Sequence, residues 1–177
     1  MITLISGGAR SGKSTFAEKL LDTDDVCYIA TAVNDGLEMQ ERIKKHRESR
    51  NQNWRTFEAY DKKLVDALGD ENNYILECLT VYISNLYYKY GKDEDITPEI
   101  AQKVEEHAIN ELKNFFEKIK SEDKNLILVT NELGMGLVPM DRLSRYYRDS
   151  VGRINQKIAS MADNVYVVFL GMELKLK

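Results

Sequence analysis

The sequence is poor in cysteine, proline and glycine, with 2, 2 and 10 of them in 177 residues. Cys27 and Cys78 each lie in an apolar run where a strand is expected, so the pattern favours two inert, buried thiols over a disulfide or a metal site. Unpaired thiols are typical of a reducing compartment, and we expect a cytoplasmic protein. Because so few prolines and glycines leave no convincing linker, residues 1–177 are predicted to form a single domain.

Long hydrophobic runs and an excess of positive charge are also absent. No stretch approaches the ~20 apolar residues that cross a bilayer, and the first residues lack the basic start and apolar core of a signal peptide. The 25 basic and 29 acidic residues give a net charge of −4, so no general positive field attracts nucleic acid or anionic lipid. We therefore expect no membrane span and no nucleic-acid partner, and any bound anion must be held locally.

What is present is an alternation of short apolar runs with helical patterns. Strands are expected at 2–6, 26–32, 74–78, 126–130 and 165–170, and helices at 15–21, 98–120 and 141–161. Strands that alternate with helices predict an α/β fold with a mostly parallel sheet flanked by helices. The runs lack polar alternation, which is typical of strands covered by helices on both faces.

A phosphate-loop motif follows the first expected strand. Residues 7–14 match the pattern G-x-x-x-x-G-K-[ST] and are Gly7, Gly8, Ala9, Arg10, Ser11, Gly12, Lys13 and Ser14. The glycines let backbone N–H groups point inward, and the following helix adds its positive N-terminal end. Lys13 can reach the β- and γ-phosphates, and the Ser14 hydroxyl can ligate Mg²⁺. The motif predicts a nucleoside triphosphate as the ligand.

A phosphate loop is usually paired with an acidic residue near Mg²⁺. Glu77 ends the apolar run 74–76, where a carboxylate is costly unless it is paired or bound to a cation. The alternative is that Glu77 is simply an exposed strand tip. Glu132, in a glycine-containing segment after the expected strand 126–130, is a competing candidate at the same sheet edge.

The sequence contains two histidines. His107 lies beside the apolar stripe of the expected helix 98–120 and is interpreted as a solvated helix residue. His46 lies in the helical segment 38–50, surrounded by Arg42, Lys45, Arg47 and Arg50. Spacing alone leaves open a partly buried helix histidine, but the basic surroundings suit a histidine that meets the phosphates of a nucleotide.

These motifs occur in an order that resembles the bifunctional adenosylcobinamide kinase/adenosylcobinamide-phosphate guanylyltransferases of cobalamin biosynthesis. The resembling blocks are 7–14 (GGARSGKS), 28–32 (YIATA), 38–50 with Arg42 and His46, 54–58 (WRTFE), 77–85 (ECLTVYISN), 129–139 (VTNELGMGLVP), 145–156 (RYYRDSVGRINQ) and 171–177. Eight blocks in the same order are far more specific than a phosphate loop alone. Residues 34–36 and 91–97 match no block of the family.

The resemblance implies a RecA-like phosphate-loop fold, usually a trimer, with two reactions. ATP or GTP phosphorylates the aminopropanol hydroxyl of adenosylcobinamide, and GTP then transfers GMP to that phosphate through a guanylyl-histidine intermediate. It implies His46 as the nucleophile and Lys13 as a catalytic group in both steps. It also implies that the guanine nucleotide is held by Thr31, Ala32, Val33, Arg47, Glu48, Ser49, Arg50, Asn51, Glu58 and Glu77.

Two other functions fit the phosphate loop itself. One is a simple kinase for a small metabolite, in which His46 is structural. The other is a nucleotide-dependent switch or assembly module whose output is a partner interaction. Both predict nucleotide binding without guanylate on the protein.

Overall fold

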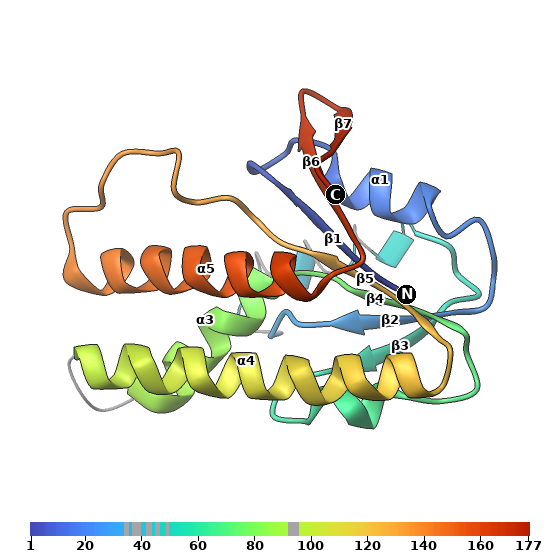
Figure 1. Cartoon of the computed structure of the whole chain (residues 1–177), viewed down its shortest axis with the longest axis horizontal. Helices are drawn as coiled ribbons and strands as arrows, with labels where there is room; N and C mark the ends of the chain where they lie inside the picture. The colour runs from blue at the N-terminus through green and yellow to red at the C-terminus, as the bar shows by residue number, and fades with distance from the viewer. Residues whose placement is uncertain (34–35, 37–39, 42–43, 45–46, 49, 92–95) are drawn as a thin grey trace.

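The computed structural model describes residues 1–33, 36, 40–41, 44, 47–48, 50–91 and 96–177. A seven-stranded sheet runs through the molecule in the order β3-β2-β4-β5-β1-β6-β7 (Figure 1). The strands are β1 (Ile2–Gly7), β2 (Val26–Ala30), β3 (Arg55–Glu58), β4 (Asn73–Leu76), β5 (Asn125–Val129), β6 (Asn164–Phe169) and β7 (Met172–Lys175). The first six pair in parallel, and β7 pairs antiparallel with β6. This arrangement confirms the predicted fold class.

Helices cover both faces of the sheet. They are α1 (Lys13–Lys19), α3 (Leu79–Gly91), α4 (Pro98–Ser121) and α5 (Arg142–Met161), with a one-turn 3-10 helix η1 (Leu64–Ala67). In β5, Leu126 and Leu128 pack into the core cluster under α3, α4 and α5, whereas Ile127 and Val129 pack into the cluster with α1. Both sides of the strand are therefore buried, which explains why the strand sequences lack polar alternation.

Each of the two long helices begins directly after a residue whose side chain caps its N-terminus. The Thr97 side chain accepts a hydrogen bond from the Ile100 N–H at the start of α4, and the Asp141 side chain accepts one from the Ser144 N–H (2.7 Å) at the start of α5. Figure 1 shows α4 and α5 side by side across one face of the sheet. The predicted packing stripe of α4 is confirmed. In α5, Val151, Ile154 and Ile158 are buried as predicted, but Leu143, which was predicted on the same stripe, is 48% exposed.

Some predictions about local structure were wrong. Sequence analysis missed the short strands β3 and β7, which are mostly exposed and carry no buried apolar run. It also placed Cys78 in a strand, but β4 ends at Leu76 and Cys78 lies beyond it, partly exposed. Cys27 is buried in β2, as predicted. Across the described residues, we find no helix with the length and apolar composition to span a membrane.

Candidate nucleotide site

The phosphate loop connects β1 to α1 at the carboxyl edge of the sheet. Gly12 caps α1 with a left-handed backbone (φ 101°), and Arg10 is left-handed as well (φ 58°). A Cβ on Gly7 would lie 2.4 Å from the carbonyl oxygen of Val168 in the neighbouring strand β6. Glycine is therefore required at position 7 by the close approach of another backbone, and at position 12 by its conformation.

Backbone hydrogen bonds from two neighbouring segments also hold the loop. The Gly171 N–H, in the turn between β6 and β7, donates a hydrogen bond to the Ser11 carbonyl (2.9 Å). The Glu132 N–H, just after β5, donates one to the Gly7 carbonyl (3.0 Å). Both neighbouring strands of β1 thus fix the shape of the loop. The turn after β6 was not recognised from the sequence as part of this site.

Lys13 is the first residue of α1, and only 6% of its surface is exposed. Its ammonium group donates a hydrogen bond to the Gly8 carbonyl, inside the curve of the loop. Burial lowers the pKa of Lys13, and the nearby Cys78 thiol acts in the opposite direction. Ser14 follows in the first turn of α1, half-buried. The positive charge and the hydroxyl therefore stand together at a helix N-terminus, an arrangement suited to a phosphate group and its Mg²⁺.

A small pocket lies at the carboxyl ends of β2, β3 and β4, at the same edge of the sheet as the loop. It is lined by Tyr28, Ala30, Ala32, Arg47, Arg50, Thr56, Glu58 and Glu77. The Arg50 guanidinium lies over the Tyr28 ring, 4.0 Å from its centroid, and donates a hydrogen bond to the Thr56 hydroxyl. Arg47 forms an ion pair with Glu58 (2.9 Å). Burial raises the pKa of Tyr28, and the negative charge of Glu77 adds to this shift.

The pocket brings together five of the residues proposed for the guanine nucleotide: Ala32, Arg47, Arg50, Glu58 and Glu77. Other predicted site residues do not join it. The Thr31 side chain is buried and donates to the Cys78 carbonyl (3.0 Å). Asn51 is exposed and donates to Asp24, ahead of β2 and away from the phosphate loop.

The remaining predicted residues are less constrained by the geometry. Val33 is half-buried at the end of the described segment 1–33, and Glu48 is exposed, 3.9 Å from Lys44. His46, Ser49 and Arg42 lie outside the described residues. For these three, the predicted roles rest on the sequence.

The two acidic candidates for Mg²⁺ differ in their surroundings. Glu77 follows β4 and shares its pocket with Arg47 and Arg50, whose positive charges compete with a cation for the carboxylate. The Glu132 carboxylate accepts a hydrogen bond from the Gly134 N–H (2.6 Å) in its own loop. The Ser14 hydroxyl fits a Mg²⁺ ligand by its position, whereas the neighbours of Glu77 fit better with a nucleotide.

Several polar side chains near Lys13 were not singled out from the sequence. The Asn131 amide, after β5, donates to the Thr80 hydroxyl (2.8 Å), which is 2.9 Å from the Cys78 sulfur. The Tyr147 hydroxyl donates to the Thr80 carbonyl (2.8 Å). For Asn131 the sequence signal is the run of polar residues 130–132 directly after β5, the position where parallel sheets carry ligand-binding groups.

Comparison with known proteins gives a match over almost the whole chain. The family model for cobinamide kinase / cobinamide phosphate guanyltransferase matches residues 3–176. A bifunctional adenosylcobalamin biosynthesis protein of Escherichia coli is 41% identical over 182 residues, with 100% of both chains covered. One of Pseudomonas aeruginosa is 35% identical over 183 residues, which covers 100% of this chain and 98% of the relative.

Among solved structures, a KaiC-like protein of Pyrococcus horikoshii gives a TM-score of 0.46 at 14% sequence identity. The alignment covers 94% of this chain and 69% of that protein.

Proposed function

Since the chain belongs to the cobinamide kinase / cobinamide phosphate guanyltransferase family, we propose that it carries out both reactions on adenosylcobinamide. It first phosphorylates the aminopropanol hydroxyl with ATP or GTP. It then transfers GMP from GTP to the new phosphate, which gives adenosylcobinamide-GDP and pyrophosphate. The observation that carries the proposal is a phosphate loop with a buried lysine at the same carboxyl edge of the sheet as a pocket that holds two arginines and two glutamates.

In the kinase step, the main work of the protein is positioning and charge neutralisation. The oxygen of the acceptor hydroxyl bonds to the γ-phosphorus, the bond from that phosphorus to the β-γ bridging oxygen breaks, and the hydroxyl proton is lost to solvent. Lys13 and the N–H groups at the start of α1 stabilise the negative charge on the departing diphosphate. The low exposure of Lys13 strengthens this interaction because little water screens it.

In the transfer step, a nitrogen of the His46 imidazole attacks the α-phosphorus of GTP and pyrophosphate leaves. The phosphate of the corrinoid then attacks the same phosphorus and releases the histidine. A neutral imidazole, with a reference pKa of ~6.5, is mostly unprotonated at neutral pH and can act as this nucleophile. Arg47 and Arg50, close to His46 in sequence, line the pocket and would offset the charge of the phosphates there.

The guanosine portion of GTP is proposed to lie in the pocket of Arg50 and Glu77. A carboxylate such as Glu77 accepts hydrogen bonds, as ribose hydroxyls and the guanine N–H groups require. Ser14 would ligate Mg²⁺, and the ion when bound would neutralise charge on the β- and γ-phosphates.

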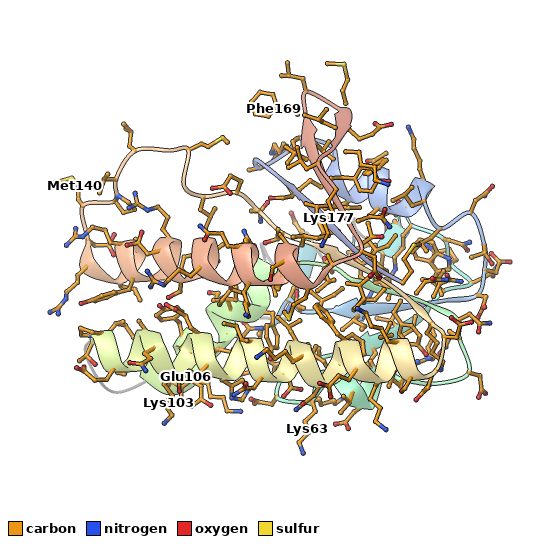
Figure 2. The ribbon with its side chains drawn as sticks, in the orientation of Figure 1. Lys63, Lys103, Glu106, Met140, Phe169 and Lys177 are labelled. Carbon is orange, nitrogen blue, oxygen red and sulfur yellow. The ribbon has the colours of Figure 1, made fainter. Side chains whose placement is uncertain are left out.

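Self-association is proposed as well, most simply as a trimer. Two segments expose apolar side chains, and Figure 2 shows Met140 in one and Phe169 in the other, both projecting outward. The exposed residues are Met135, Leu137, Val138 and Met140 after β5, and Phe169, Leu170, Met172 and Leu174 in the β6–β7 hairpin. Runs of exposed apolar side chains of this kind are typical of an interface between proteins. Native mass spectrometry tests this, and a monomer at micromolar concentration would contradict it.

A single domain over 1–177 and a cytoplasmic location stay predictions.

Placement of radiolabel tests the proposed function against its alternatives. The protein is incubated with adenosylcobinamide and with GTP labelled in the γ- or the α-phosphate, and the corrinoid products are separated. The proposal expects γ-label in a first product and α-label in a second, with release of pyrophosphate. Transfer of γ-label alone would indicate a simple kinase, and nucleotide binding without any transfer would indicate a switch module.

A further inference from the structure

A second pocket, of ≈ 420 Å³, lies apart from the nucleotide site. Its walls are the segment 59–63 that follows β3, and the facing sides of α3 and α4. Pockets of this size hold small ligands, and a nucleoside fits where a whole corrin ring does not. Neither the phosphate loop nor the pocket of Glu77 contributes to its lining.

Aromatic rings form part of the lining. Tyr60, in the segment after β3, and Tyr88, in α3, are 40% and 61% exposed, whereas Tyr82 of the same lining is buried. His107 is half-buried and bonded to the Tyr90 hydroxyl (2.7 Å), so the prediction of a solvated helix residue is wrong. Exposed aromatic rings beside a cavity are suited to stacking against a planar base.

Hydrogen-bond acceptors line the pocket beside these rings. Asp61 and Glu111 contribute carboxylates, and one oxygen of Glu111 already accepts the Leu64 N–H (2.7 Å). Carboxylates are the usual partners of ribose hydroxyls in nucleotide-binding proteins. The lining therefore combines groups for a base with groups for a sugar.

The charges that line the pocket nearly cancel one another. Lys62, Lys63 and Lys89 line it as exposed side chains, and Figure 2 shows Lys63 projecting from the surface. Asp61 and Glu111 offset two of these three charges. Among the described residues that line the pocket there is no glycine, so a glycine-rich loop of the kind that binds an anion is not part of this lining. An uncharged nucleoside group matches this mixed lining better than a nucleotide does.

The pocket is connected to the phosphate loop through a short series of contacts. The Asn85 amide, in its wall, donates to the Thr31 carbonyl (2.8 Å), and the Thr31 hydroxyl donates to the Cys78 carbonyl (3.0 Å). Cys78 is in turn near enough to Lys13 to affect its pKa. A large substrate anchored in the pocket can therefore extend along the carboxyl edge of the sheet toward the phosphate loop.

We propose that this pocket binds the adenosyl group of the corrinoid substrate, with the adenine against Tyr60 or Tyr88 and the ribose hydroxyls at Asp61 and Glu111. The assignment rests on the proposed function, because that function supplies the adenosylated substrate. It makes the upper ligand of the corrinoid a determinant of affinity. The aminopropanol arm remains free to present its hydroxyl to the γ-phosphate.

Kinase assays with two corrinoids test the proposal. Tyr60→Ala and Tyr88→Ala each remove one exposed ring, and Tyr60→Phe and Tyr88→Phe keep the rings as matched controls. The KM is measured for adenosylcobinamide and for dicyanocobinamide, which lacks the adenosyl group. The ratio of interest is the KM for adenosylcobinamide divided by the KM for dicyanocobinamide. We expect at least one alanine variant to raise this ratio about 10-fold, the loss typical of one stacked base. The phenylalanine variants are expected to keep the wild-type ratio. An unchanged ratio in both alanine variants would overturn the proposal.

A binding measurement separates this proposal from the proposed function. Adenosine is titrated into the full-length protein saturated with GTP, so that the phosphate loop is already filled. Weaker binding in an alanine variant than in its phenylalanine control supports the pocket, and failure of adenosine to bind overturns it. Tighter binding of AMP than of adenosine would assign the pocket to a nucleotide and also overturn it. If neither corrinoid is phosphorylated by the wild-type protein, the proposed function fails. The adenosine titration then still tests whether the pocket binds a nucleoside.

Discussion

The change Glu77→Gln separates two roles that the sequence left open. The substitution keeps the shape of the side chain and removes its charge. Glu77 is half-buried directly after β4, in the pocket that Arg47 and Arg50 also line. Because two positively charged guanidinium groups line the same pocket and disfavour a further cation there, we expect the GTP requirement to change and the Mg²⁺ requirement to stay.

The size of the effect follows from the hydrogen bonds that the carboxylate makes. A hydrogen bond to a charged group contributes about 1.5–3 kcal/mol, which corresponds to roughly a 10- to 150-fold rise in the KM for GTP. Guanylyl transfer is measured while GTP is titrated at saturating Mg²⁺, and while Mg²⁺ is titrated at saturating GTP. Glu132→Gln is the matched control, since the Glu132 carboxylate lies outside this pocket and accepts a hydrogen bond from Gly134.

Any of three results would refute this reasoning. A higher Mg²⁺ requirement with an unchanged KM for GTP would make Glu77 a ligand of the ion. No shift in either titration would make Glu77 an exposed strand tip without a role in binding. A shift of the same size in Glu132→Gln would show that the effect is not specific to the pocket.

Three further changes probe the loop and the edge of the sheet. Lys13→Ala is expected to lower kcat/KM of both reactions by about 10²–10³, because the same ammonium group stabilises both leaving groups. Rate assays of the two reactions test this. Loss of kinase activity alone would require two nucleotide sites. Gly7→Ala places a Cβ 2.4 Å from a carbonyl oxygen of β6, whereas a Cβ at Gly8 meets nothing within 4 Å. Equilibrium titration should therefore show weaker GTP binding for Gly7→Ala than for the control Gly8→Ala. Equal affinities of the two variants would contradict this. Arg55 holds the pKa of Glu71 below its ordinary 4.5, so this pair stabilises the fold above pH 4.5 and the contribution is lost as pH falls through the lowered pKa. Glu71→Gln should therefore reduce the free energy of unfolding by about 1–2 kcal/mol at pH 7 and by less at pH 3, and an equal loss at both pH values in denaturant unfolding would exclude the charge as its cause.

The phosphate loop was predictable because its chemistry is local. Conformation at Gly12, the charge of Lys13 and the flanking strand and helix all come from consecutive residues, and the structure has them as predicted. The long helix α4 was predictable for a similar reason, since its apolar stripe and its Thr97 cap are both written within one segment. In these parts, sequence and structure agree to within one or two residues.

The parts that were missed depend on contacts between distant segments. Strand β3 is a four-residue edge strand that pairs with β2. No periodic pattern in its sequence indicates this pairing. The inward direction of Thr31 follows from its bonds to residues 47 and 54 positions away. The pocket at 59–63, α3 and α4 likewise exists only once these segments are packed together.

The most direct test of the proposed function is whether GMP becomes attached to His46. The protein is incubated with GTP labelled in the α-phosphate, denatured and separated by electrophoresis. The account predicts a labelled protein band that is lost in acid and stable in base, as expected of a bond between phosphorus and the imidazole nitrogen. His46→Asn is expected to fold, by circular dichroism, and to carry no label. Full labelling of His46→Asn would contradict the account.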